Sequence, residues 1–181
     1  MLFSQNSSNG GLLASPLLLK RQVFYSFHYY NDHWRASQVR NIGVVEGNRP
    51  ATDNDWETVT KSGERAIENW INNQMKGRSC LVLLIGSETA GRKWIKYEIT
   101  KAWELKMGVV GIYVHNLKNQ GQSTARQGIN PFAEFNLNGV SLDSIVKSYN
   151  PPYWDSKQVY KYIADNIRVW TNEAVEIRKK Y

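Results

Sequence analysis

The chain has 181 residues, 41 % of them apolar, and a formal net charge of +7 at pH 7. This length predicts one domain with one core, and the apolar content excludes an intrinsically disordered chain. The longest apolar run, Cys80–Ile85, is far shorter than the roughly 20 residues that cross a bilayer. The basic residues are scattered and follow no groove-binding motif, so neither a membrane nor a nucleic acid is an expected partner.

The first twenty residues differ in composition from the rest of the chain. They contain one charged residue and a Ser/Asn/Gly cluster, without the basic start and long apolar run of a secretory signal. We therefore expect a flexible tail over residues 1–20 and a single domain over residues 21–181. Cys80 is the one cysteine, which excludes an internal disulfide and fits a reducing, cytoplasmic location.

From residue 22 onward, apolar runs typical of strands alternate with patterns typical of helices. The expected strands are residues 22–27, 42–45, 79–85, 108–114 and 145–149. The expected helices are residues 32–39, 56–75, 92–107 and 155–179, with Asp32, Asp55 and Asp155 as caps. Polar loops are expected over residues 46–54 and, at greater length, over residues 116–138.

This alternation predicts an α/β fold with a parallel sheet and right-handed crossovers. The number of strands favours a flavodoxin-like three-layer sandwich with a five-stranded parallel sheet in the order 2-1-3-4-5. In that order a ligand crevice lies beyond the carboxyl ends of the first and third strands. The residues at those two ends are Ser26, Phe27, His28, Gly86 and Ser87.

A carboxylate and an indole form the main candidate site. Glu98 follows Trp94 by four residues on the helix after Gly86 and Ser87, so the two side chains share one helix face. An aromatic ring beside a carboxylate suits a flat cationic ring bonded to a sugar, and one carboxylate can stabilise an oxocarbenium-like state. The structural alternatives are a surface Glu98 paired with Lys101 and a Trp94 that belongs to the core.

The other candidates also have structural alternatives. Ser26 and Ser87 suit turns, although their backbone amides also suit phosphate oxygens at a helix start. His28 could satisfy a loop carbonyl, and Trp56 is a helix start or a wall of the site. The remaining histidines have no metal-ligand spacing with another histidine or with cysteine, so no metal is expected.

Several of these segments together resemble a known family, the TIR-like domains, and in particular the single-domain group that includes the TIR-like subunit of Thoeris anti-phage systems. The resemblance covers roughly residues 21–170. The segments that carry it are Val23–His28, Asp32, Trp56, Ile85–Thr89, Trp94, Tyr97–Ile99, Gly111–Ile112 and Gly128–Phe132.

The resemblance implies cleavage of NAD, as substrate and without a further cofactor, at the nicotinamide–ribose bond. In Thoeris members it implies a cyclic ADP-ribose isomer or a related nucleotide that switches on a separate effector protein. By this resemblance, Glu98 is the catalytic glutamate of TIR domains. Ser26 and His28 border the dinucleotide, and residues 46–54 occupy the place of the mobile loop that gates TIR active sites. A phage-derived trigger and a homo-oligomer are further expected partners.

Two other functions are compatible with the same residues. A catalytically silent TIR-like scaffold would keep the glutamate without turnover, and a nucleotide-sensing module would use the same crevice. A phosphorylated receiver is disfavoured because the third strand ends in Gly86 and Ser87 and not in aspartate. Neither a serine-hydrolase elbow nor the glycine signature of a kinase or dehydrogenase is present in the sequence. The choice between hydrolysis and cyclisation depends on water exclusion and is not decided by the sequence.

Overall fold

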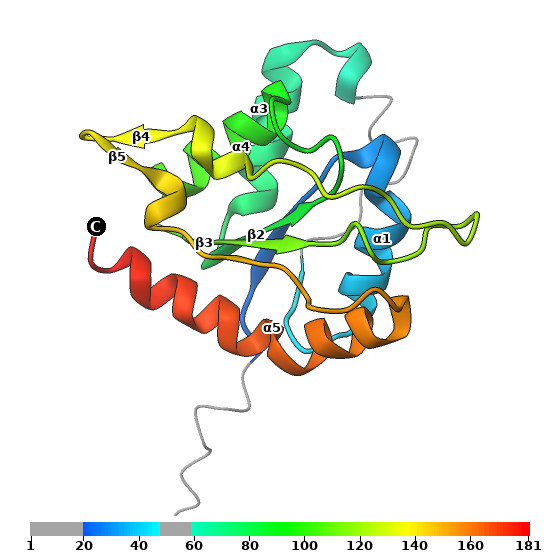
Figure 1. Ribbon diagram of the computed structural model, residues 1–181. Helices are drawn as coiled ribbons and strands as arrows, with labels where there is room; N and C mark the ends of the chain where they lie inside the picture. Colours follow the sequence, from blue (N-terminus) through cyan, green and yellow to red (C-terminus); the bar gives the residue numbers. More distant parts are fainter. Residues whose placement is uncertain (1–19, 48–58) are drawn as a thin grey trace, which may run out of the picture.

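The computed structural model describes residues 20–47 and 59–181, and its centre is a parallel β-sheet between two layers of helices (Figure 1). Within these residues the sheet has four strands in the order β1-β2-β3-β6. The strands are β1 (Val23–Ser26), β2 (Cys80–Ile85), β3 (Gly108–Tyr113) and β6 (Ser148–Tyr149), and all neighbouring pairs are parallel. The architecture is therefore α/β, as predicted, and is consistent with a flavodoxin-like fold.

Each face of the sheet has its own hydrophobic core, because successive side chains of a strand point to opposite faces. Every residue of β1, β2 and β3 is buried, which explains why these strands lack a polar alternation. Helices α1 (Tyr29–Asn41) and α5 (Ser156–Arg178) cover one face (Figure 1). Helices α3 (Glu64–Met75) and α4 (Lys93–Glu104) cover the other.

The predicted strand at residues 42–45 is wrong, and the five-stranded order is not confirmed. The chain meets β1 there through one parallel bridge between Gln22 and Glu46. The backbone N–H of Val23 donates to the carbonyl of Glu46 over 2.8 Å. Helix α1 runs to Asn41, and Gly43 then turns the chain with a φ of +69°. The segment therefore turns over residues 42–45 and pairs with β1 only at Glu46 within the described residues.

Two helices begin at other residues than the sequence pattern predicts. Helix α1 begins at Tyr29, so Asp32 lies in its first turn as a buried partner of Arg35 and does not cap it. Helix α3 begins at Glu64, because Gly63 has a φ of +89° and interrupts the predicted helix 56–75. The first residues of that predicted helix, including its cap Asp55, lie outside the described residues.

The C-terminal third contains a small hairpin where the sequence predicts only a loop. Strands β4 (Asn136–Leu137) and β5 (Val140–Ser141) pair antiparallel around Asn138 and Gly139, which both have a positive φ. Short 3₁₀ turns η2 (Pro131–Glu134) and η3 (Leu142–Ser144) flank the hairpin. The last predicted strand, 145–149, is reduced to the two residues of β6.

Helix α5 confirms the predicted closing helix. The Asp155 carboxylate accepts hydrogen bonds from the backbone N–H groups of Lys157 and Gln158 over 3.1 and 3.0 Å, as an N-cap should. In the ranges that the structure covers, none of the helices combines the length and apolarity of a membrane span. The predicted tail, apart from Lys20, lies outside the described residues.

Candidate active site

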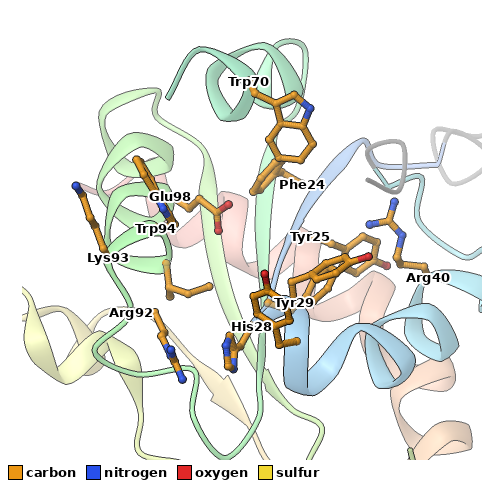
Figure 2. Close-up of a pocket in the computed structure, with 13 residues that line it drawn as sticks. Phe24, Tyr25, His28, Tyr29, Arg40, Trp70, Arg92, Lys93, Trp94 and Glu98 are labelled. Atoms are coloured by element: carbon orange, nitrogen blue, oxygen red, sulfur yellow. The ribbon is translucent and has the colours of Figure 1, made fainter. Parts of the chain in front are cut away.

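A cavity of about 330 Å³ opens beside β1 and the start of α4 (Figure 2). Its wall combines side chains from β1, both ends of α1, α3 and α4. Phe24 and Tyr25 belong to the cores on opposite faces of the sheet, so the cavity reaches around β1. The lining is mostly aromatic, with three cationic groups and one carboxylate. Its residues are Phe24, Tyr25, Phe27, His28, Tyr29, Tyr30, Arg40, Trp70, Arg92, Lys93, Trp94, Ile95 and Glu98.

Glu98 is the one carboxylate among the residues that line this cavity. Figure 2 shows its side chain directed from α4 into the cavity. The Ser26 hydroxyl, buried at the end of β1, donates a hydrogen bond to Oε2 of Glu98. Burial raises the pKa of Glu98 to about 8, against the opposing effect of the Ser26 hydrogen bond. A carboxyl group with such a perturbed pKa in a cleft is a candidate functional group.

Trp94 is partly buried and has both of the roles that the sequence left open. Its indole packs against the core on the α3–α4 face and also lines the cavity. The Tyr97 ring meets it edge to face, with 6.0 Å between ring centroids, and the Lys93 ammonium lies 5.1 Å from its ring centroid. Lys93 also forms an ion pair with Glu64 at the start of α3. These contacts fix the indole one helical turn before Glu98.

His28 follows β1 and occupies the N-cap position of α1 without making a side-chain capping bond. Within the described residues its Nδ1 is buried and has no hydrogen-bond partner. The pKa of His28 is lowered by burial and, to a smaller extent, by the Arg92 guanidinium. The imidazole is therefore neutral at pH 7 and faces the same cavity as Glu98.

Gly86 and Ser87 are not among the residues that line the cavity. Gly86 is packed too closely for any side chain, because a Cβ atom there would lie 2.0 Å from Oδ2 of Asp32. A Cβ atom on Gly128 would likewise lie 2.0 Å from the carbonyl oxygen of Gly86. The end of β2 therefore supports the loop after β3.

The buried ion pair of Asp32 and Arg35 holds that loop in place. Its two charged groups are 3.1 Å apart, and both residues are almost fully buried. The Arg35 guanidinium also donates to the backbone carbonyls of Leu117 and Ser123 over 2.8 and 3.2 Å. The first part of the predicted loop 116–138 is thereby attached to α1, behind the end of β2.

The structure thus brings together most of the predicted site. Phe27, His28, Trp94 and Glu98 line one cavity, and Ser26 contacts Glu98 from behind. Trp56 and most of the predicted gating loop 46–54 lie outside the described residues.

Several wall residues were not predicted from the sequence, including Tyr29, Arg40, Trp70 and Arg92. Tyr29 directly follows His28, and Arg92 lies six residues before Glu98. Their closeness in sequence to predicted site residues could have indicated both. Arg40 lies near the end of α1, and Trp70 lies in the middle of α3. Their place at the cavity follows from packing alone.

A family model decides which proteins this chain is related to. The model for the Thoeris protein ThsB, TIR-like domain, matches residues 24–119, which include every residue that lines the cavity. The chain belongs to this ThsB TIR-like family. A curated relative from Bacillus cereus (strain MSX-D12), named "Putative cyclic ADP-D-ribose synthase ThsB1", is 33 % identical over 119 residues. The alignment spans 63 % of this chain and 62 % of that relative, so it covers less than two thirds of either ThsB-like protein.

Proposed function

We propose that this ThsB-like chain cleaves NAD at the nicotinamide–ribose bond and forms an ADP-ribose-type nucleotide. The observation that carries the proposal is the position of Glu98 inside an aromatic cavity, held by the Ser26 hydroxyl. The name of the Bacillus cereus relative supports the same reaction class, because a cyclic ADP-ribose is made from NAD by loss of nicotinamide.

The cavity suits the nicotinamide riboside half of NAD. The pyridinium ring of NAD is flat and cationic, and such a group is attracted to the face of Trp94 or of a tyrosine. Cavities of about 300–1,000 Å³ are typical ligand sites, and 330 Å³ is at the small end of that range. We therefore place the nicotinamide and its ribose inside the cavity and the adenosine half across its rim.

Cations at the rim suit the phosphates of the dinucleotide. Arg92 and Lys93 begin the α4 side of the cavity, and Arg40 lies at its opposite end, above the Tyr25 ring at 5.5 Å from the centroid (Figure 2). Arg92 and Lys93 also neutralise Glu88 and Glu64 at the surface. The pyrophosphate can displace these exposed carboxylates from Arg92 and Lys93, because exposed ion pairs contribute little free energy.

Binding of the substrate would change the charge of Glu98. A pyridinium beside the carboxyl favours its ionised form and lowers the pKa that burial has raised, so the carboxyl proton passes to solvent as the substrate binds. The resulting carboxylate lies where positive charge develops on the ribose, and it is held there before the reaction, which is how a preorganised charge lowers a barrier. The bond between ribose and ring then breaks, and its electron pair leaves with neutral nicotinamide.

The wider role follows from the family and is part of the same proposal. The nucleotide product would switch on a separate effector protein in anti-phage defence, after a phage-derived trigger and assembly of the chain into a homo-oligomer. The cytoplasm, where NAD is abundant, is the compartment that this role requires.

The test is NAD turnover by the purified chain, followed by chromatography of nicotinamide and nucleotide products. Protein at high concentration, with and without a crowding agent, is compared with Glu98→Gln and with Glu104→Gln. Glu104 is on the same helix but is exposed and paired with Lys101. We expect release of nicotinamide by wild type and Glu104→Gln, and a loss of about 100-fold or more in Glu98→Gln.

Two results would overturn the proposal. The first is no nicotinamide release under any of these conditions, and the second is an equal rate in Glu98→Gln. Binding of NAD without release would instead show the nucleotide-sensing function, and absence of both would show a silent scaffold.

A further inference from the structure

A second chemical group, the His28 imidazole, faces the cavity and packs edge-on against the Tyr30 ring, with 6.4 Å between the ring centroids. His28 lies two residues after Ser26, where β1 gives way to α1, and so enters the wall from a different element than Glu98 does (Figure 2). Its ring does not cap α1, and its Nδ1 is buried without a hydrogen-bond partner in the part of the chain that the structure describes. Because Nδ1 is shielded in this way, Nε2 is the ring nitrogen that can exchange a proton with a molecule in the cavity.

Burial, together with the Arg92 guanidinium, keeps the His28 imidazole neutral by lowering its pKa. Burial lowers its pKa most, Arg92 lowers it further, and Glu88 partly opposes both. Arg92 and Glu88 form an ion pair with each other over 2.9 Å, so they act on the ring together. A neutral imidazole has one nitrogen lone pair, and it can accept a proton near neutral pH.

Glu98 has the higher pKa of the two groups, but its carboxylate has another task while the hydroxyl attacks. One of its carboxylate oxygens already accepts the Ser26 hydrogen bond, and its charge is needed beside the ribosyl cation. The proposed reaction nevertheless releases one proton when the oxygen of a hydroxyl group takes the place of nicotinamide on the ribose. The cavity must pass this proton either to bulk water or to a base in its wall.

We propose that His28 is this base: it accepts the proton of an adenosine-ribose hydroxyl that attacks the ribosyl cation of the same molecule, and so favours the cyclic product over hydrolysis. The role rests on the proposed function. In the step, the hydroxyl oxygen donates an electron pair to the anomeric carbon and forms a C–O bond, while its O–H bond breaks. The proton passes to the imidazole, which becomes imidazolium and later returns it to solvent.

The experiment measures the ratio of cyclic to linear ADP-ribose product between pH 5 and 7.5. Both products follow the same cleavage of NAD. The protonation of Glu98 therefore changes the rate of both equally, and their ratio reports only the step after cleavage. Wild type is compared with His28→Asn, which keeps a polar side chain without a basic nitrogen. His33→Asn is the matched control, because His33 is exposed on α1 and does not line the cavity.

For wild type and His33→Asn we expect the ratio to rise with pH and to level off above the lowered pKa of His28. In His28→Asn the ratio should fall at least about tenfold at pH 7.5 and lose its pH dependence, since a positioned base contributes about 10²–10⁴-fold. Folding of each variant is checked by circular dichroism.

Three results would overturn the role of His28. They are an unchanged ratio in folded His28→Asn, a ratio in wild type that does not vary with pH, and a wild type that makes only the linear product. The last two need no variant, so the proposal stays testable if His28→Asn does not fold. Each of the three leaves NAD cleavage standing, whereas a wild type that releases no nicotinamide would overturn the proposed function and this role together.

Discussion

Replacement of Glu98 by glutamine should stabilise the protein at neutral pH while it removes the proposed activity. Glutamine keeps the size of the side chain, and its carbonyl oxygen can still accept the Ser26 hydrogen bond. The substitution therefore removes mainly the cost of placing a negative charge in the wall of the cavity. A residue that costs stability in this way is retained for what it does in the site.

The size of the effect follows from proton linkage. The pKa of Glu98 is about 8 in the folded protein, against an ordinary value of 4.5 for the unfolded chain. Between these values the folded state holds a proton that the unfolded state has lost, so the free energy of unfolding falls as the pH rises. The loss is about 1 kcal/mol at pH 5 and about 4 kcal/mol at pH 7.5.

The assay is urea unfolding of wild type, Glu98→Gln and Glu104→Gln at pH 5 and pH 7.5. The advantage of Glu98→Gln over wild type should grow by about 3 kcal/mol between the two pH values. In thermal unfolding this corresponds to about 6–12 °C for a chain of this size. Glu104→Gln should show no such growth, because Glu104 is exposed. An advantage that stays constant with pH would refute the view that burial raises the pKa of Glu98.

Two further substitutions test the wall of the cavity and its support. Trp94→Ala should keep its fold by circular dichroism and weaken NAD binding in calorimetry by about tenfold or more, because stacking on an indole contributes about 1–3 kcal/mol. A folded variant that binds NAD as tightly as wild type would show that the indole serves the core alone. Arg35→Met should lower the free energy of unfolding by about 3–5 kcal/mol, because it leaves the Asp32 carboxylate buried and without its cation. The double variant with Asp32→Asn should lose less than Arg35→Met, and an equal or larger loss would contradict this interpretation.

Features that depend on local pattern could be predicted from the sequence. The uniformly apolar runs gave strands that are buried on both faces, and Asp155 caps α5 as its position before an apolar pattern predicts. The four-residue spacing of Trp94 and Glu98 placed both side chains in one cavity. These features need only the period of a helix or strand and the chemistry of a cap.

Features that depend on backbone turns or on packing were missed. Gly63 interrupts a pattern that otherwise continues as a helix, and Gly43 turns the chain within the predicted strand 42–45. The hairpin of β4 and β5 had a local signal, because Asn138 and Gly139 form the dipeptide that two-residue hairpin turns prefer. Arg40 had no such signal, since its place at the cavity follows from the docking of α1 against the sheet.

The central claim is that NAD binds in this cavity with its nicotinamide–ribose bond beside Glu98. The most direct measurement is a crystal structure with an NAD analogue in which a methylene group replaces the ribose ring oxygen, so that no bond is cleaved. We expect the ring carbon that bears the pyridinium to lie about 3–3.5 Å from a Glu98 oxygen, the distance of a productive complex, with the pyridinium against Trp94. An analogue bound elsewhere on the chain, or bound here with Glu98 turned away from the sugar, would contradict the account.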